Sequence, residues 1–343
     1  MSQPTVCNLT LEYYEEWNNF VLSSDEGTFF HLSQWITVIE SIYNFKPYYL
    51  YVRRAGEITA VLPLFLTNSF IFGKKYISSP LCVYGGVLSN DITSCELLLD
   101  EVTKLGNEQG VKYIELRNTN RIIETWQTND SFYTFKKKLH TSEDENYHAI
   151  PRKQRAMIRK GQQAGLTSEV SSDIDLFYNI YSDSMHRLGT PVYPRKYFYV
   201  LANIFQEKCR IMFIRKDSQP ISAVLSFYYK NQVLPYYAGG RLDARTFKAY
   251  DFMYWNLMCR SVAEGIGIFD FGRSTKGSGT FSFKKNWGFQ PQKLFYQYKL
   301  IKAKSVPNIN PLNPKYKIAI ALWKRLPSPI ANKIGPIVSG YLG

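Results

Sequence analysis

The sequence predicts an α/β (α+β) protein in which two similar domains with mixed sheets follow one another along the chain. Short apolar strands alternate with helical patterns, which is typical of layered α/β proteins. Strand pairs joined by short polar turns indicate antiparallel neighbours rather than a purely parallel sheet. A strand–turn–strand segment at 49–65 also reappears at 211–227. A repeat of this length indicates a duplicated domain rather than a solenoid of short units.

The similarity continues beyond the strand pair. Each copy continues with an aromatic–glycine step, a helix, a glycine that follows the helix, and another strand. In the first copy the step, the glycine and the strand are Tyr84–Gly86, Gly110 and Tyr113–Leu116. In the second copy they are Tyr237–Gly240, Gly265 and Ile268–Phe271. We therefore expect domains at 1–145 and 146–302, followed by a basic, proline-rich tail at 303–343. Two like domains create a cleft, where we expect the ligand site.

The expected elements of the first copy follow from the spacing of apolar residues. Leu97, Leu98, Val102 and Leu105 form one stripe of a helix. Apolar runs of four to eight residues indicate strands. We expect helices near 10–22, 31–43 and 91–109, and strands near 48–54, 58–68, 112–117 and 132–139.

The second copy is expected to begin with a polar helix at 143–164, which Gly165 ends. The same spacing rules predict the elements that follow. We expect helices near 174–187, 195–206 and 246–264, and strands near 209–216, 221–230, 232–238, 267–272 and 293–301.

The net charge of +14 is unevenly distributed. Residues 1–150 hold 12 Lys/Arg and 18 Asp/Glu, residues 151–302 hold 24 and 10, and residues 303–343 hold six and none. Basic charge confined to one domain indicates an anionic partner such as phosphate, nucleic acid or a lipid headgroup.

Five scattered cysteines and four scattered histidines show no metal-site or redox-motif spacing. We expect reduced thiols, no metal and no tightly bound cofactor. The first residues lack the pattern of a secretory signal, and no apolar run is long enough to span a membrane. These observations predict a cytoplasmic protein, with the inner face of the membrane as a second location.

The stretch 268–289 carries the strongest functional pattern. An apolar strand ends at Asp270, and a glycine-rich basic loop follows with aromatic residues among its cations, Arg273, Lys276, Lys284 and Lys285. Glycines let the backbone approach a ligand, and the cations can neutralise phosphate or an oxyanion. A solvated basic loop is the alternative. The segment lacks the lysine–hydroxyl ending of a phosphate-binding loop of ATPases, so ATP hydrolysis is not indicated.

Three further segments are candidates. Arg241 lies before the predicted helix at 246–264, a suitable place for an anion, and Tyr237 precedes it. His186 is by its chemistry the most plausible base at neutral pH, with Tyr193 nearby. Five cations at 151–160 are more simply read as a solvated helix face. For Arg241 and His186 the alternatives are solvent-facing cations and a structural hydrogen bond.

These segments resemble a known family. Residues 179–193, 237–255 and 269–289 are similar to the second domain of FemAB-type proteins of the GNAT acyltransferase superfamily, above all to the group associated with exosortase (PEP-CTERM) and exopolysaccharide systems. The motifs are Arg187–Pro191, Asp251–Trp255, Phe269–Ser274 and Phe283–Phe289. The resemblance implies two tandem GNAT-like domains with the acyl-CoA N-acyltransferase fold.

The resemblance also implies transfer of an acyl or aminoacyl group to an amine of a cell-envelope precursor, either a peptidoglycan peptide or an exopolysaccharide amino sugar. Lys284 or Lys285 would then match the family's functional lysine. Asp270, Asp251 and His186 are the candidates for proton transfer, and Arg273, Lys276, Arg241, Tyr237 and Tyr193 for substrate binding. No coiled-coil arm is inserted, and 239–249 lacks the pyrophosphate loop of acetyl-CoA-dependent enzymes.

The donor therefore stays open between aminoacyl-tRNA and acyl-CoA. An acetyl- or acyl-CoA-dependent GNAT N-acetyltransferase is the alternative activity. A non-catalytic scaffold of an exopolysaccharide assembly system is the alternative from another class. In the tail, cations mix with apolar residues, which suits either an anionic membrane surface or packing against the protein body.

Overall fold

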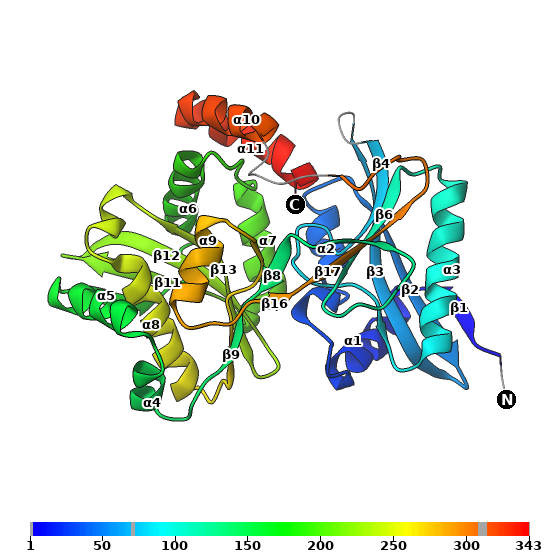
Figure 1. Cartoon of the computed structure of the whole chain (residues 1–343), viewed down its shortest axis with the longest axis horizontal. Helices are drawn as coiled ribbons and strands as arrows, with labels where there is room; N and C mark the ends of the chain where they lie inside the picture. Colours follow the sequence, from blue (N-terminus) through cyan, green and yellow to red (C-terminus); the bar gives the residue numbers. More distant parts are fainter. Residues whose placement is uncertain (1–2, 70–72, 308–313, 343) are drawn as a thin grey trace. The chain divides into compact units, whose positions relative to one another are not determined.

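The computed structural model describes residues 3–69, 73–307 and 314–342, and this part of the chain divides into two compact units. Of the described residues, those within 1–132, 293–308 and 340–343 form unit 1, and those within 133–292 and 309–339 form unit 2. Each unit has its own sheet with helices on both faces (Figure 1). We describe the two units separately.

The sheet of unit 1 has the order β1–β2–β3–β4–β6–β17–β7, with β5 beside β3. Its neighbours are antiparallel except for β4 and β6, which run parallel. The strands are β1 (Thr5–Asn8), β2 (Lys46–Arg54), β3 (Glu57–Ser69), β4 (Gly73–Ser78), β5 (Leu88–Ser89), β6 (Tyr113–Asn118), β7 (Gln127–Asn129) and β17 (Phe295–Leu300).

Alternate residues of these strands enter two different cores, as the twofold repeat of a strand requires. Leu62 and Leu64 of β3 pack with Leu98 and Val102 of α3 (Ile92–Glu108), which lies across one face in Figure 1. Aromatic residues of the other face pack with α1 (Tyr14–Ser23) and α2 (Trp35–Glu40). This side contains Trp17 and Tyr49, whose ring centroids are 5.1 Å apart.

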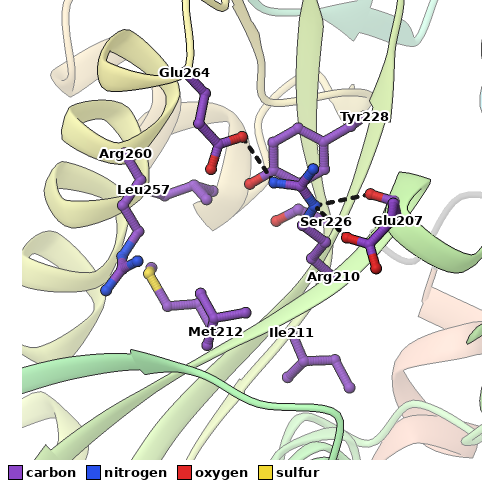
Figure 2. Close-up of a pocket in the computed structure, with 10 residues that line it drawn as sticks. Glu207, Arg210, Ile211, Met212, Ser226, Tyr228, Leu257, Arg260 and Glu264 are labelled. Atoms are coloured by element: carbon purple, nitrogen blue, oxygen red, sulfur yellow. Dashed lines mark hydrogen bonds and ion pairs between the residues drawn. The ribbon is translucent and has the colours of Figure 1, made fainter.

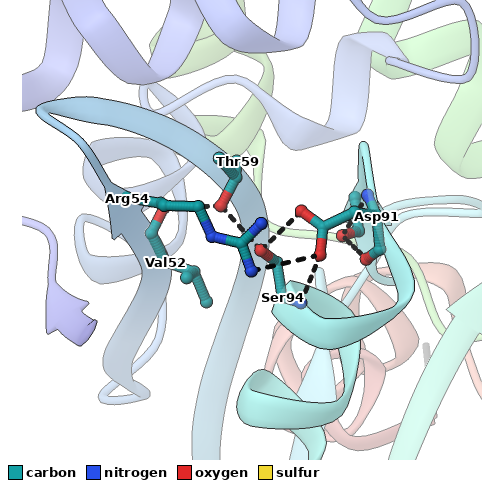
Figure 3. A network of polar contacts seen from close by, with 6 residues as sticks. Val52, Arg54, Thr59, Asp91 and Ser94 are labelled. Carbon is teal, nitrogen blue, oxygen red and sulfur yellow. Dashed lines mark hydrogen bonds and ion pairs between the residues drawn. The ribbon is translucent and has the colours of Figure 1, made fainter. Parts of the chain in front are cut away.

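The start of α3 is fixed by a polar network, shown in Figure 3. Asp91 caps the helix: its carboxylate accepts hydrogen bonds from the backbone N–H and the hydroxyl of Ser94, both at 2.8 Å. Arg54 of β2 lies 3.8 Å from the same carboxylate, and the Thr59 and Ser94 hydroxyls are 2.7 Å apart. The hydrogen bonds from Ser94, together with the charge of Arg54, lower the pKa of Asp91. This network joins the helix to β2 and β3.

The sheet of unit 2 repeats this plan with the order β10–β11–β12–β13–β14–β9. Again one central pair, β13 and β14, is parallel, and the others are antiparallel. The strands are β9 (Lys136–Lys138), β10 (Thr167–Val170), β11 (Cys209–Lys216), β12 (Gln219–Tyr229), β13 (Gln232–Gly240) and β14 (Ile268–Asp270). A small third sheet joins β15 (Ser274–Thr275), β8 (Phe132–Thr134) and β16 (Gln292–Lys293).

Helices cover both faces of this sheet as well. Met253 and Leu257 of α8 (Ala249–Ala263) enter the core with Met212 and Val224. The other face packs against α6 (Ile174–Leu188) and α7 (Arg195–Phe205). The remaining helices are α4 (Glu143–His148), α5 (Arg152–Gln163), α9 (Gly279–Asn286), α10 (Pro314–Arg325) and α11 (Ser328–Leu342), with short 3-10 turns η1 (Leu11–Tyr13), η2 (Phe29–His31), η3 (Gln206–Lys208) and η4 (Leu242–Arg245).

The matching sheet orders confirm the predicted mixed α/β fold in two copies, but the closing strands differ from expectation. The strand expected at 132–139 in the first copy is divided, and its second part, β9, pairs with β14 in unit 2. The strand expected at 293–301 in the second copy is β17, which pairs with β6 in unit 1. Each sheet thus receives its closing strand from the part of the sequence assigned to the other copy.

Other differences are local. The helix expected at 143–164 is divided into α4 and α5, because Pro151 precedes α5 and restricts the backbone before it. Strand β4 was not predicted, because its first residues, Gly73-Lys74-Lys75, do not show the apolar spacing of a strand. In the structure Lys75 is nevertheless buried. The stretch expected as a basic, proline-rich tail contains α10 and α11; its residues 308–313 and 343 lie outside the described residues.

The closing strand of unit 1 supplies a buried hydrogen-bond centre that gives a stability prediction. The side-chain oxygen of Gln297 accepts from the Asn118 amide at 3.0 Å and from the backbone N–H groups of Ile122 and Ile123 at 3.1 and 3.3 Å. Gln297→Ala leaves these donors unpaired, which we expect to lower the free energy of unfolding by about 1–3 kcal/mol. Urea denaturation measures this, with the exposed Gln292→Ala as control; equal stability of both variants would contradict the role of Gln297.

Candidate functional site

The candidate site lies in unit 2, where β14 ends and the chain passes through a short loop into α9. The loop turns sharply at Gly272, whose φ of +66° lies in the left-handed region that favours glycine. Ser278 caps α9 by accepting a hydrogen bond from the backbone N–H of Phe281 at 3.2 Å. Half of the stretch expected to be a loop is therefore a helix.

Asp270, the last residue of β14, is completely buried and held by several polar groups. Its carboxylate accepts a hydrogen bond from the backbone N–H of Gly272 at 2.8 Å and one from the Thr134 hydroxyl at 3.2 Å. The ammonium group of Lys136 on β9 lies 3.4 Å away. Since its exposed fraction is 0%, Asp270 cannot touch a substrate directly. Its position suits a structural role beneath the loop.

Lys284 is buried on α9 and donates hydrogen bonds to the backbone carbonyls of Gly272 and Arg273, at 2.9 and 3.0 Å. Burial lowers the pKa of Lys284 to about 7; the charge of Asp270 opposes this shift and that of Arg273 adds to it. Lys284 and Asp270 therefore hold the same loop residue, Gly272, from its carbonyl and its N–H sides. The backbone of the loop is fixed where its cations emerge.

The adjacent Lys285 is exposed, because neighbouring residues of a helix point about 100° apart. Lys276 in the loop is exposed too, and Arg273 is half-buried. From the sequence alone, Lys284 and Lys285 were equal candidates for the functional lysine. In the structure Lys284 is buried and contacts the loop, whereas Lys285 faces the solvent. Arg273, Lys276 and Lys285 are thus the cations of this segment that can meet an anion.

Asp251, in the first turn of α8, lies beside the same segment. Its carboxylate accepts a hydrogen bond from the indole N–H of Trp287 at 3.1 Å, just after α9. Burial raises the pKa of Asp251 to about 6, while the hydrogen bond from Trp287 and the charge of Lys248 oppose the shift. A half-buried carboxylate with this pKa is ionised at neutral pH and can still accept a proton.

The structure brings the other predicted residues to different places. His186 contacts the carbonyl oxygen of Leu326 at 2.8 Å and the Ser328 hydroxyl at 3.2 Å, so both ring nitrogens face the C-terminal helices. These contacts agree with the alternative interpretation of His186, in which the histidine makes a structural hydrogen bond. Arg241 is exposed ahead of η4.

Tyr237 is buried in an aromatic cluster. Its hydroxyl lies 2.9 Å from that of Tyr197, and its ring centroid is 5.8 Å from that of Tyr193. Burial, followed by the neighbouring tyrosines, raises the pKa of Tyr237 well above its ordinary value. The buried Tyr237 hydroxyl serves the core, whereas the half-buried Tyr193 reaches the surface.

Sequence reasoning missed Thr134, Lys136 and the contact of Trp287 with Asp251. Thr134 and Lys136 lie within the segment assigned to the first copy, which hid their relation to Asp270. One signal was available: three consecutive lysines, Lys136–Lys138, stand out in the acidic first 150 residues. Among the described residues, no group of three or more His, Cys, Asp or Glu side chains is arranged to hold a metal.

Comparisons with known proteins agree with this architecture. Residues 152–285 match the family model described as an acetyltransferase (GNAT) domain. The chain is similar to the crystal structure of FemX, with a TM-score of 0.68 and 14% identity over 87% of this chain and 98% of FemX. No curated protein matches the chain.

Two other solved structures share the fold. The C-terminal domain of a putative lysylphosphatidylglycerol synthetase from Agrobacterium fabrum has a TM-score of 0.57 and 12% identity, covering 91% of this chain and 95% of that domain. A tandem GNAT protein from the clavulanic acid biosynthesis pathway has a TM-score of 0.55 and 8% identity, covering 89% and 100%. The chain thus carries the GNAT acyltransferase fold in two tandem copies.

The buried Lys284 gives a pH-dependent stability prediction. Its pKa is about 7 in the folded protein and about 10.4 in an unfolded chain, so between these values the unfolded state binds more protons. The free energy of unfolding of the wild type should therefore rise with pH relative to Lys284→Met, by up to about 1.4 kcal/mol per pH unit. Chemical denaturation between about pH 7.5 and 9.5 measures it. The exposed Lys285→Met should follow the wild type, and a pH-independent difference for Lys284→Met would contradict the prediction.

Proposed function

We propose that this protein transfers an acyl or aminoacyl group to an amine of a cell-envelope precursor, a peptidoglycan peptide or an amino sugar of an exopolysaccharide. The observation that carries this proposal is the rigid basic loop after β14, held by the buried Asp270 and Lys284 within an acyltransferase fold. The similarity to FemX and to a lysylphosphatidylglycerol synthetase supports aminoacyl transfer. The motifs shared with the exosortase (PEP-CTERM) group add the exopolysaccharide alternative.

In this proposal the cations bind the phosphates of the donor. Arg273, Lys276 and Lys285 meet the anionic part of aminoacyl-tRNA or acyl-CoA, while Lys284 and Asp270 position the loop that presents them. Unit 2 and the C-terminal segment hold the excess positive charge of the chain, which suits such a donor. We place the reaction in the cytoplasm, where both donors occur.

The reaction also requires a proton acceptor. As the amine nitrogen bonds to the carbonyl carbon, the ester C–O bond of the tRNA or the thioester C–S bond of CoA breaks. The amine loses a proton, and the leaving oxygen or sulfur gains one. Asp251 is the acceptor that the geometry supports best, because Asp270 is buried and both His186 nitrogens have structural contacts. From Asp251 the proton can pass to the leaving group.

This role of Asp251 is testable by turnover. Asp251→Asn keeps an oxygen for the Trp287 hydrogen bond but removes the base, so we expect kcat to fall about 10²–10⁴-fold with little change in KM. The wild-type rate should fall as the pH drops below about 6, where Asp251 becomes protonated. Release of tRNA or CoA in the presence of a peptidoglycan-precursor amine is the measurement. Asp243→Asn, an exposed change on η4, is the control, and full activity of Asp251→Asn would exclude the proposed base.

Salt dependence distinguishes the two donors. A tRNA contacted at several phosphates should lose about 10³-fold or more in affinity between about 50 and 200 mM salt, and CoA much less. Lys276→Gln/Lys285→Gln should weaken donor binding and reduce this slope, whereas Lys208→Gln on η3 should not. An unchanged slope in the double variant would contradict phosphate binding by this loop. The absence of turnover with any acyl donor would favour the scaffold alternative.

The proposal includes contact of α10 and α11 with an anionic membrane surface. Both helices expose aliphatic side chains at helical spacing, Ile318 (66%), Leu322 (60%), Ile330 (46%), Ile334 (39%) and Ile337 (69%). The cations Lys317, Lys324, Arg325 and Lys333 are exposed, and no acidic residue follows residue 302. On its other side α10 packs against α6, where Ile320 adjoins Gly189. The exposed aliphatic side chains and the cations support a contact with the membrane surface. No helix within the described ranges is both long and apolar enough to cross a bilayer.

Vesicle binding tests this contact. Ile318→Ser/Leu322→Ser should reduce co-sedimentation with phosphatidylglycerol vesicles several-fold, because it removes apolar area that would enter the interface. Leu242→Ser, which changes an aliphatic residue that is 80% exposed on η4, is the matched control. Equal binding by all three proteins, or no binding by the wild type, would refute the membrane contact.

A further inference from the structure

A pocket of about 330 Å³ lies in unit 2 between the C-terminal half of α8 and the adjoining ends of β11 and β12 (Figure 2). Leu257, Arg260 and Glu264 reach it from the helix side, and Met212, Ser226 and Tyr228 from the strands. Its volume falls in the range of pockets that bind small molecules. Asp251 is at the other end of α8; the 13 residues from it to Glu264 correspond to about 20 Å of helix. The pocket is therefore separate from the candidate acyl-transfer site.

The first sign of a ligand is Ser226. Ser226 is one of the residues that line the pocket, its exposed fraction is 1%, and its buried hydroxyl has no hydrogen-bond partner. An unpaired buried polar group of this kind costs about 1–3 kcal/mol, so its retention calls for an explanation. The pairing of β12 with β13 shifts between Leu225 and Ser226, and such bulges often redirect side chains near binding sites. A ligand in the pocket would complete the hydrogen bonding of this hydroxyl.

The two arginines of the pocket differ in their partners. Arg210 is held in place: it donates to Glu264 at 2.7 Å and to the Glu207 carbonyl at 2.8 Å, and lies over the Tyr228 ring at 4.5 Å. Arg260 is exposed, and within the described part of the chain no carboxylate lies within ion-pair distance of it. A guanidinium group in this situation is suited to a carboxylate, which it can bind through two parallel hydrogen bonds.

The remaining groups narrow the class of ligand. Met212 and Leu257, each 2% exposed, supply apolar surface. Two guanidinium groups and the carboxylates of Glu207 and Glu264 also line the pocket, so its formal charge is balanced. A simple carboxylic acid would add an uncompensated negative charge beside Glu264. A molecule with both an ammonium and a carboxylate group keeps the balance.

We propose that this pocket binds a free amino acid with an apolar side chain. The carboxylate pairs with Arg260, and the ammonium group faces Glu264 and the Ser226 hydroxyl, which accepts its hydrogen bond. The carboxylate of Glu264 has lone pairs beyond the one used by Arg210. The side chain covers Met212 and Leu257. This inference does not depend on the acyl-transfer reaction, since the pocket shares no residue with the proposed base or the basic loop.

The test uses the full chain with leucine and two analogues that each lack one charge, 4-methylpentanoate and 3-methylbutylamine. Calorimetry or ligand-observed NMR should show leucine binding, with both analogues at least about tenfold weaker, the equivalent of a lost charge-assisted hydrogen bond. Arg260→Gln and Ser226→Ala should each weaken leucine binding to a similar extent. Arg245→Gln, an exposed change on η4, should not.

Folding of the variants is checked by thermal unfolding, where Ser226→Ala should be at least as stable as the wild type because it removes an unpaired hydroxyl. Absence of leucine binding to the wild type would overturn the proposal. So would binding of 4-methylpentanoate as tightly as leucine, because the ammonium group would then have no role. Unchanged leucine affinity in both variants would show that the ligand binds elsewhere.

Discussion

The arrangement of the candidate site depends on satisfying one buried carboxylate, that of Asp270. An ionised side chain without solvent contact is strongly unfavourable unless charges and hydrogen bonds surround it. Lys136, Thr134 and the N–H of Gly272 provide them. The last of these contacts determines the direction in which the chain leaves β14. Lys284 then fixes the same turn, because its ammonium group donates a hydrogen bond to the carbonyl oxygen of Gly272.

This requirement connects the site to the topology of the sheet. Lys136 comes from β9, a strand that precedes the rest of unit 2 in the sequence, and it pairs directly opposite Asp270. The acidic and basic partners are thus brought together by strand pairing rather than by proximity in the sequence. A loop built only from the residues after β10 would contain the cations for a donor, but not the counter-charge under its first turn.

Much of the fold could be predicted from the sequence. The spacing of apolar residues indicates which helices and strands form, and the internal repeat indicates that the same arrangement occurs in two copies. The partner of a strand is not encoded in its own spacing, which explains why the placement of β9 and β17 was missed. Lys75 shows a second limit: a lysine can be buried in a strand when its surroundings accept it, and composition alone then suggests a loop.

For the candidate site, the sequence identifies a segment and its residue types, but the role that each residue can take depends on the direction in which its side chain points. Lys284 and Lys285 are neighbours in a glycine-rich stretch, and only the presence of α9 shows that one faces inward. Asp270 and Asp251 were equal candidates for proton transfer from the sequence, and they differ in the structure for a similar reason. Their burial, which separates a structural carboxylate from an accessible one, comes from elements distant in the sequence.

The closing strands make the two copies depend on each other unequally: unit 1 is completed by β17, which follows unit 2 in the sequence, whereas the sheet of unit 2 is continuous from β9 to β14. A cut before β9 leaves the sheet of unit 2 with all six of its strands, but it separates β17 from the sheet of unit 1 and leaves β6 with a bare edge. Bare edges invite pairing with other chains and hence aggregation. Loss of the second copy by truncation would therefore harm the first, whereas loss of the first copy before β9 would leave the sheet of unit 2 complete.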